Sequence, residues 1–225
     1  MKKLLILFLL LGSVETKAQK PNPFGLHIIN NLETYREYVK TDPDKELVEL
    51  KKYIPGIKLD IRYATKNNFT EQAVYKQARA FARRPVAEAL KSVQSELKKS
   101  GLGLKVFDGY RPYTVTVRFF AIASNKSFVA NPKDGSRHNR GCAIDLTLID
   151  LKTGKELAMP TPYDSFAPEA ASDFKDLPEE VLKNRELLRT VMEKNNFRVL
   201  NNEWWHFDFI GWRNFELMDI PFEAL

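Results

Sequence analysis

The sequence predicts an α+β fold: a single domain in which a mostly antiparallel central sheet is flanked by helices. Two strand-like segments near the C-terminus, FRVL and WWHFDFI, are separated by only three residues, a spacing typical of antiparallel hairpins. Segments with helical spacing interrupt the strands in a mixed order. The chain has 225 residues, 44% of them hydrophobic, which is enough to bury one core.

The first eighteen residues, MKKLLILFLLLGSVETKA, have the layout of a secretory signal peptide. Two lysines precede an apolar run from Leu4 to Leu11, and a more polar stretch ends at Ala18, where we expect cleavage. We therefore expect an exported protein of the bacterial periplasm. The alternative is a retained membrane anchor. We expect no stable anchor, because the run is too short to span a bilayer and no cysteine follows it to carry a lipid.

Charge and cysteine usage narrow the class of partner. Removal of residues 1–18 takes away three lysines and one glutamate, which lowers the formal net charge from +6 to +4. Basic and acidic residues are interspersed along the rest of the chain, so the sequence predicts no nucleic-acid partner. Cys142 is the single cysteine, which rules out an internal disulfide. Its alternation with apolar neighbours favours a small core residue over a reactive thiol.

The N-terminal part of the mature chain, residues 19–57, is predicted to form an arm followed by a helix. Residues 19–41 form the arm. The segment TDPDKELVELKKYIPG, residues 41–56, begins with capping residues and a proline suited to a first helical turn, and it ends at a Pro-Gly pair. IKLDIRY, residues 57–63, then alternates like a strand.

The clearest helix is RRPVAEALKSVQSELKKSGLG, whose apolar residues share one face and which Gly101 ends. The other predicted elements, in chain order, are a strand and turn at 102–112, a helix at 112–125, a strand at 142–149, a return strand at 151–157, a long loop to about Asp176, a helix at 178–195, and strands at 197–200 and 204–210.

Two of the three histidines lie beside predicted strands. His138 precedes the strand 142–149, which contains Asp145, and His206 lies within the last strand. Histidine nitrogen and aspartate oxygen are suitable ligands for zinc, and a catalytic zinc site keeps one position open for water. A buried carboxylate requires a partner. Asp145 therefore shares a metal with the two histidines, or it pairs with an arginine or backbone donors; the spacing alone leaves both interpretations open.

Glu203 and Arg111 are candidates for the chemistry beside such a metal. Glu203 lies three residues before His206, and a glutamate beside a ligand can serve as the base of a metallopeptidase. In a regular strand the two side chains would point to opposite faces, so Glu203 must lie in the turn or at a bulge; the alternative is a solvated turn residue. Arg111, in DGYRP, can stabilise an oxyanion, or it forms a structural salt bridge, for instance with Asp108.

Four motifs, in the same order along the chain, resemble those of the zinc D,D-peptidases. SRHNRGCAIDLTL, residues 136–148, fits the pattern S-x-H-x-x-G-x-A-x-D of that family. DGYRP, EWWHF and the earlier DIRYATKNNF narrow the resemblance to the D-alanyl-D-alanine dipeptidases. The resemblance runs from about Leu59 to about Phe209, and it implies that residues 58–225 form a zinc dipeptidase catalytic domain.

The resemblance implies a metal site and its catalytic groups. One zinc ion per chain is expected, held by His138, Asp145 and His206. Glu203 is implied as the catalytic base, which takes a proton from the attacking water and passes it to the leaving amine. Arg111 is implied to stabilise the negative charge of the transition state.

The resemblance also implies how a small D,D-dipeptide is bound. Tyr63 in DIRYAT and Asp164 in PYDSF match the residues that hold the free amine of the dipeptide, and Ser136 matches a serine near its carboxylate end. A site that pairs both charged ends is expected to reject longer peptides, whose ends would leave these groups unpaired. The implied reaction is hydrolysis of D-alanyl-D-alanine to two D-alanines.

Two alternatives accompany this interpretation. The same metal ligands serve zinc D,D-carboxypeptidases and wall endopeptidases that act on longer stem peptides. A non-catalytic zinc module that binds wall fragments would lack Glu203 or Arg111, and both are present. The predicted signal peptide favours scavenging of D-alanine dipeptides released from the wall over destruction of a cytoplasmic precursor.

Overall fold

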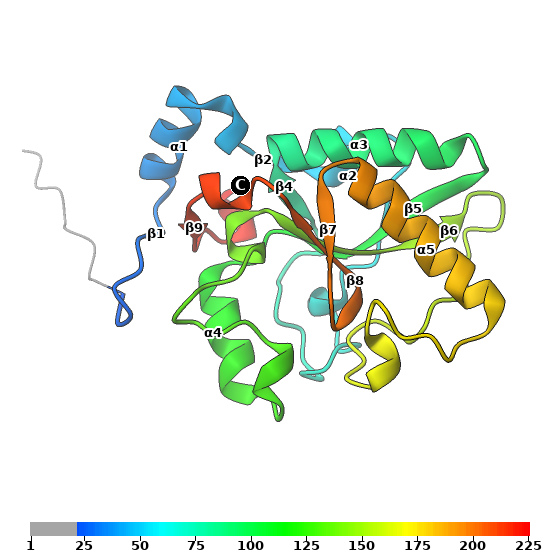
Figure 1. Cartoon of the computed structure of the whole chain (residues 1–225). Helices are drawn as coiled ribbons and strands as arrows, with labels where there is room; N and C mark the ends of the chain where they lie inside the picture. Colours follow the sequence, from blue (N-terminus) through cyan, green and yellow to red (C-terminus); the bar gives the residue numbers. More distant parts are fainter. Residues whose placement is uncertain (1–21) are drawn as a thin grey trace, which may run out of the picture.

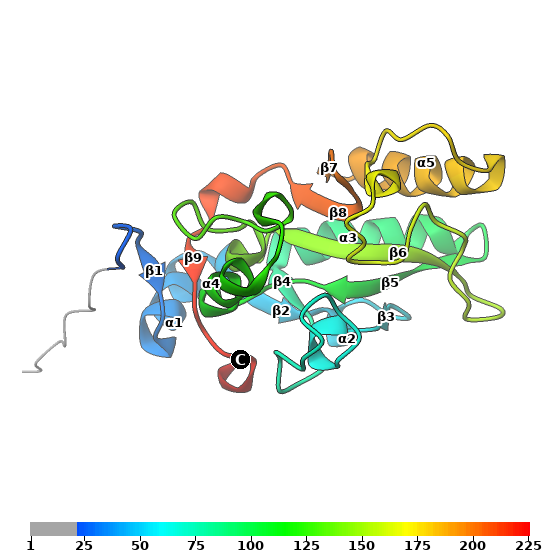
Figure 2. The ribbon, with the colours of Figure 1, turned by 90° about the horizontal axis from the view of Figure 1, so that it is seen from below.

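A computed structural model describes residues 22–225, so the predicted signal peptide lies outside the described residues. A five-stranded sheet in the order β3-β5-β6-β8-β7 forms the centre (Figures 1 and 2). In that order, the strands span Lys58–Leu59, Leu102–Asp108, Ala143–Asp150, Glu203–Phe209 and Phe197–Leu200. The α+β prediction is confirmed. The sheet is mixed, because β3 pairs with β5 in parallel, whereas the other three pairings are antiparallel.

Two long helices lie side by side on one face of this sheet. They are α3 (Arg84–Lys98) and α5 (Glu179–Lys194), and α4 (Tyr113–Ile122) lies beyond the end of β5 (Figures 1 and 2). All three match predicted helices. The stripe by which α3 packs on the core is at most 3% exposed and comprises Val86, Leu90, Val93 and Leu97.

The strand that carries Asp145 is buried on both of its faces. Every residue of β6 from Ala143 to Ile149 is buried, so this strand runs through the middle of the core. Cys142, immediately before β6, is fully buried, as predicted for a core residue. Burial raises the pKa of its thiol to about 12, which leaves almost no reactive thiolate at neutral pH.

The prediction of a single helix over residues 41–56 is wrong. The chain instead forms a 3-10 turn at Pro43–Lys45, the strand β2 (Leu47–Glu49) and the short helix α2 (Leu50–Tyr53). Asp42 caps the 3-10 turn as a helix cap would, but β2 pairs with β4 (Phe81–Arg83) in an antiparallel ladder. This tertiary pairing overrides the local helical preference.

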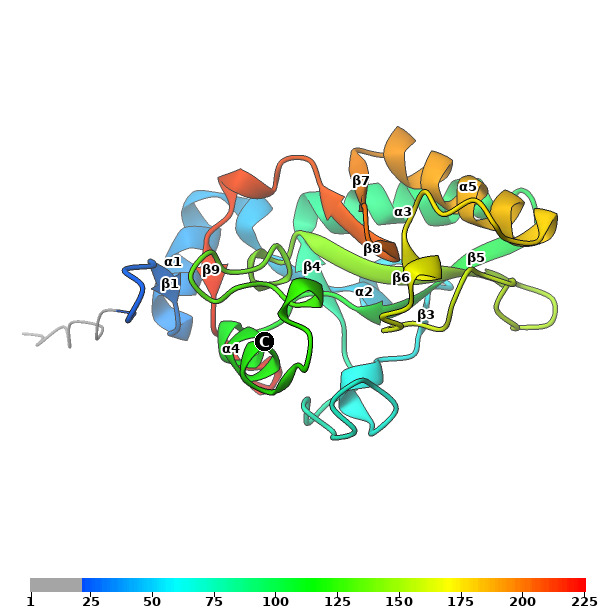
Figure 3. The same ribbon diagram turned by 60° about the horizontal axis from the view of Figure 1, so that its bottom comes forward.

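The predicted arm also holds more structure than its sequence suggests. It contains a helix, α1 (Leu32–Thr41), and a strand, β1 (Ile28–Ile29), that pairs in parallel with β9 (Leu217–Met218) (Figure 3). The fully buried Arg83 connects the N-terminal segment, the turn before β6 and the segment before β9. Its guanidinium donates to the backbone oxygens of Lys45, Arg140 and Glu216.

Two other predicted strands are much shorter than expected. Residues 57–63 form only β3 and then a 3-10 turn at Arg62–Ala64, and the return strand at 151–157 is reduced to one bridge between Ile149 and Glu156. No helix within residues 22–225 combines the length and apolar character needed to cross a membrane.

Candidate metal and catalytic site

Three neighbouring strands place acidic and imidazole side chains in one row across the sheet. Asp108 on β5 is the register partner of Asp145 on β6, and Asp145 is the partner of His206 on β8. His138 comes from a 3-10 turn just before β6. Gly141 ends this turn with a φ of +69°. A Cβ at Gly141 would also lie 2.7 Å from Leu47, so glycine serves both the turn and the packing.

Side-chain atoms of His138, Asp145 and His206 converge on one point. Asp145 Oδ1 lies 3.0 Å from His206 Nδ1 and 3.4 Å from His138 Nε2, and the two nitrogens are 3.2 Å apart. All three residues are buried, and their ligand atoms lie within 4.8 Å of one another. The structure therefore brings together the three predicted metal ligands, although they are separated by up to 68 residues along the chain.

The outer nitrogens of both rings are fixed by hydrogen-bond acceptors. His138 Nδ1 lies 2.7 Å from the carbonyl oxygen of Gly109, and His206 Nε2 lies 3.0 Å from Asp208 Oδ1. Each acceptor holds a proton on the outer nitrogen, so the inner nitrogen of each neutral ring presents a lone pair. The acceptors were not identified from the sequence. Asp208 lies two residues after His206, so regular strand alternation puts the two side chains on one face and was a usable signal, whereas a backbone carbonyl leaves no signal in a sequence.

The Asp145 carboxylate has one partnered and one unpartnered oxygen. Its Oδ2 accepts a hydrogen bond from the Tyr163 hydroxyl at 2.9 Å, whereas its buried Oδ1 has no hydrogen-bond partner. An unsatisfied carboxylate oxygen facing two nitrogen lone pairs is costly without a cation between them. Two imidazole nitrogens and one carboxylate oxygen fit zinc, and three protein ligands leave a position open.

The electrostatics of the cluster also demand a positive charge. Burial favours a neutral imidazole at His206, but the carboxylates of Asp145 and Asp208, each 3.0 Å from one of its ring nitrogens, outweigh burial and raise the pKa of His206 well above the ordinary value. Burial likewise opposes ionisation of Asp145, yet the two histidines hold the pKa of its carboxyl below the ordinary range. Asp145 is thus suited to remain an anionic ligand.

Glu203 lies beside the ligands because the β7–β8 hairpin is irregular. The register shifts between Val199 and Leu200, so Leu200 pairs with Glu203 instead of continuing the ladder. The carboxylate of Glu203 reaches within 3.7 Å of His206 Nδ1, although the two are three residues apart. Glu203 therefore lies at the bulge that the sequence argument required and is not a solvated turn residue. Burial raises its pKa to about 7, which suits a general base near neutral pH.

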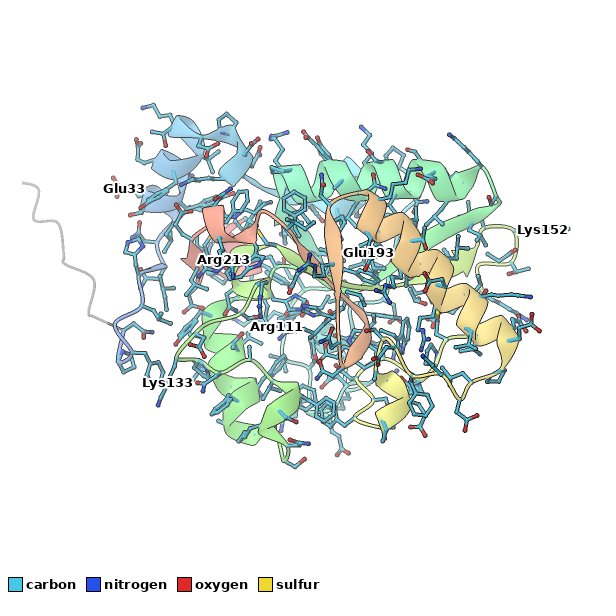
Figure 4. The ribbon with its side chains drawn as sticks, in the orientation of Figure 1. Glu33, Arg111, Lys133, Lys152, Glu193 and Arg213 are labelled. Carbon is cyan, nitrogen blue, oxygen red and sulfur yellow. The ribbon has the colours of Figure 1, made fainter. Side chains whose placement is uncertain are left out.

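Arg111 lies between α4 and the β7–β8 hairpin (Figure 4). Its Nε and Nη2 donate to Asp108 Oδ2 at 3.0 and 2.8 Å, so the structural salt bridge considered from the sequence is present. Its Nη2 is also 3.9 Å from Asp145 Oδ2, and its guanidinium carbon lies 4.9 Å from the ring centre of Phe119. The salt bridge holds the guanidinium beside the metal ligands and does not exclude a role there.

Tyr63 and Asp164 meet although 101 residues separate them. The Tyr63 hydroxyl donates to Asp164 Oδ1 at 3.0 Å, while Asp164 Oδ2 is buried without a partner. Burial, reinforced by the negative charge of Asp145, raises the pKa of Asp164 to about 8. Asp164 also has a φ of +62°, a conformation that non-glycine residues rarely adopt and that is retained mainly at functional sites.

Ser136 lies at the start of the turn that presents His138. Its hydroxyl accepts the backbone N–H of His138 at 3.2 Å, and the amide oxygen of Asn139 accepts the backbone N–H of Ser136 at 2.8 Å. The fully buried Asn139 also donates to the carbonyl oxygen of Arg111. Asn139, which the sequence did not single out, thus ties the metal-ligand turn to the arginine segment.

All eight predicted site residues line one cavity of about 240 Å³. This volume is small beside the roughly 300–1,000 Å³ typical of pockets for drug-sized ligands. No residue before Tyr63 lines it within the described chain, so the N-terminal segment does not cover the cavity. An apolar wall that the sequence did not predict faces the polar groups and comprises Phe69, Phe119, Phe128, Phe166 and Trp205.

His138, Asp145 and His206 form a buried group of potential metal ligands, which we call the metal cluster. The Glu203 carboxyl, with its raised pKa, and the fixed guanidinium of Arg111 line the same small cavity. This combination defines a metal-dependent hydrolase. Similarity to known proteins identifies the family of this hydrolase. Residues 43–219 match the sequence profile of the Peptidase M15 family, described as D-ala-D-ala dipeptidase. The chain belongs to this family of metallopeptidases.

Individual relatives agree with the family match. The D-alanyl-D-alanine dipeptidase of Escherichia coli K12 is 33% identical over 163 residues, covering 72% of this chain and 84% of the relative. That of Enterococcus faecalis V583 is 31% identical over 184 residues, covering 72% and 90%. A solved LD-carboxypeptidase structure, LdcB, aligns at 20% identity with a TM-score of 0.38, covering 60% of this chain and 61% of the other.

Proposed function

We propose that the protein is an exported, zinc-dependent dipeptidase that hydrolyses D-alanyl-D-alanine to two D-alanines. Family membership supports a dipeptidase. The observation that carries the substrate assignment is the shared cavity, in which the metal cluster and the half-satisfied carboxylate of Asp164 lie together. Such a cavity fits a molecule with a free ammonium group next to a peptide bond.

His138, Asp145 and His206 would hold the zinc ion, which when bound would act as a Lewis acid towards the peptide carbonyl and would lower the pKa of a water molecule. Glu203 accepts a proton from the attacking water and returns it to the amine of the departing D-alanine, so the proton is conserved over the cycle. Arg111, held in place by Asp108, donates hydrogen bonds to the negatively charged oxygen of the transition state.

The free amine of the dipeptide is assigned to Asp164. An ammonium group beside Asp164 Oδ2 would give this oxygen its missing partner, and Tyr63 holds the other oxygen in place. Ser136, whose hydroxyl lies beside the ligand turn, is assigned to the carboxylate end. A longer stem peptide has an amide nitrogen in place of the ammonium group, so it would leave Asp164 buried and unpaired.

The main alternative is a zinc D,D-carboxypeptidase or wall endopeptidase that acts on longer stem peptides. Hydrolysis of D-alanyl-D-alanine and of a stem pentapeptide, measured on the zinc-loaded protein, separates the two. We expect release of D-alanine from the dipeptide with little or no cleavage of the pentapeptide. Cleavage of the pentapeptide alone would refute the dipeptidase assignment. The second alternative, a non-catalytic wall-binding module, predicts that neither substrate is cleaved.

Replacement of Asp164 by asparagine tests the amine site. We expect Asp164→Asn to raise the KM for D-alanyl-D-alanine by about 10- to 100-fold, because a hydrogen bond to a charged group contributes about 1.5–3 kcal/mol. N-acetylation of the dipeptide removes the ammonium charge, so the KM of the wild type for the acetylated dipeptide is expected to rise by a similar factor. Asp176→Asn, an exposed aspartate elsewhere in the chain, is the matched control. Equal KM values for Asp164→Asn and wild type would contradict the assignment.

Export is proposed from the signal-peptide pattern of residues 1–18. An exported dipeptidase would recover D-alanine dipeptides released from the wall outside the inner membrane. Fractionation of cells that express the full chain, with N-terminal sequencing of the mature protein, tests this proposal. Recovery of an uncleaved chain from the cytoplasm would refute it.

A further inference from the structure

A second, basic cavity lies next to the catalytic cavity. Its volume is about 240 Å³, and its lining comprises Arg137, Arg198, Asp208, Ile210, Trp212 and Arg213. We call it the arginine groove. No step of the proposed reaction uses it, yet it shares a lining residue, Arg137, with the catalytic cavity.

The arginine groove carries positive charge that the described chain does not neutralise. The guanidinium carbons of Arg137 and Arg213 lie 4.9 and 4.2 Å from the centre of the Trp212 ring system. Arg137 forms an ion pair with Asp208 at 3.5 Å, whereas Arg198 and Arg213 pair with no carboxylate within residues 22–225. Like charges gathered around one indole repel one another, and a bound anion would offset that repulsion.

Arg137 is the group that joins the arginine groove to the catalytic cavity. Its guanidinium has five N–H donors, and none of them makes a hydrogen bond within the described part of the chain; its side chain is 45% exposed. It stands between Ser136 and His138 in sequence. Its ion-pair partner Asp208 accepts a hydrogen bond from His206. The free donors of Arg137 are therefore next to the metal cluster and available to a ligand.

A series of contacts connects the proposed amine site to Arg137 through the metal-ligand residues. On one side, Tyr163 beside Asp164 donates to Asp145. On the other side, Asp208 links His206 to Arg137. A dipeptide with its ammonium group at Asp164 and its peptide carbonyl at the metal cluster would direct its C-terminal carboxylate towards Arg137.

We propose that Arg137 binds the free C-terminal carboxylate of the substrate, and that the arginine groove provides the surrounding positive potential for it. The inference rests on the proposed function for the direction of the dipeptide. A planar guanidinium with unused donors is suited to hold a carboxylate by two parallel hydrogen bonds. The arginine groove thereby selects substrates that end at the second residue over substrates whose carboxylate is blocked or extended.

Binding of D-alanyl-D-alanine and of its uncharged C-terminal amide tests the proposal. Titration calorimetry of zinc-loaded Glu203→Gln protein measures both dissociation constants without turnover. We expect the acid to bind more tightly than the amide, and Arg137→Gln to weaken binding of the acid by about 10-fold while leaving the amide unchanged. Arg198→Gln combined with Arg213→Gln is expected to weaken acid binding by about 3-fold, and the difference should shrink in high salt.

The two ligands separate recognition from a structural effect. If Arg137 only positioned His206 through Asp208, Arg137→Gln would weaken acid and amide binding by the same factor, which would overturn the proposal. An unchanged ratio of the two dissociation constants, or no binding of either ligand, would also overturn it. Arg189→Gln, an arginine on α5 that pairs with Glu193, is the matched control and should leave the ratio unaltered. Binding of the acid by zinc-loaded wild-type protein without any hydrolysis would refute the proposed reaction and leave the carboxylate site intact.

Discussion

Replacement of Glu203 by glutamine is expected to lower the kcat for D-alanyl-D-alanine by about 10²- to 10⁴-fold, because general acid–base catalysis contributes on that scale. The amide of glutamine occupies nearly the same space but cannot accept the proton of the attacking water. Glu203 is not one of the three residues whose atoms converge at the metal point, so zinc content should remain at one ion per chain. Stopped-flow or endpoint release of D-alanine, together with metal analysis of the same sample, measures both quantities.

The control for this prediction is Glu193→Gln, which makes the same chemical change on the exposed side of α5 (Figure 4). Its kcat is expected to match that of the wild type. Equal activity of the Glu203→Gln protein would remove Glu203 from the mechanism. Loss of zinc along with activity would instead make it a ligand or a support for one.

Replacement of His206 by alanine is expected to abolish both zinc binding and hydrolysis. The substitution removes one of three ligands and leaves Asp145 and Asp208 without their shared imidazole partner. The wild type should also gain thermal stability from zinc. A free concentration of 100 times the dissociation constant contributes about 2.7 kcal/mol, or roughly 5–10 °C in Tm for a chain of this size.

The Tm of the His206→Ala protein should not respond to zinc. Comparing Tm with and without zinc therefore tests the ligand assignment independently of catalysis. His27→Ala is the matched control, because His27 is exposed in the N-terminal segment far along the chain from the cluster. It should keep the zinc-dependent rise in Tm and full activity. A zinc-dependent rise in the His206→Ala protein equal to that of the wild type would contradict the ligand assignment.

The helices and long strands were predictable because their signals are local. Apolar spacing identified α3 and α5, alternation identified β6, and the three-residue connection to FRVL indicated β8. The segment 41–56 misled the same reasoning. Its capping residues and Pro-Gly stop are real signals, but β2 within it pairs with β4, and a residue in a strand is stabilised by partners that local sequence does not contain.

The candidate site divides in the same manner. His138, Asp145, His206 and Glu203 were candidates from the sequence because few residue types can ligate zinc or accept a proton, and the resemblance to the zinc D,D-peptidases implied their roles. Their partners cannot be read in this way. The hydrogen bond from His138 to the carbonyl of Gly109 involves a backbone group, and any residue type would have offered the same oxygen.

The sequence by itself therefore indicated the α+β class, and together with the family resemblance it named the eight candidate side chains and their order along the chain. Only the tertiary structure decided that they meet. The register of β5, β6 and β8 brings Asp145 opposite His206, and the bulge in the β7–β8 hairpin turns Glu203 to the same side. The physical reason is that ligand convergence depends on non-local pairing and on departures from regular alternation, which are set by packing of the whole domain and not by neighbouring residues.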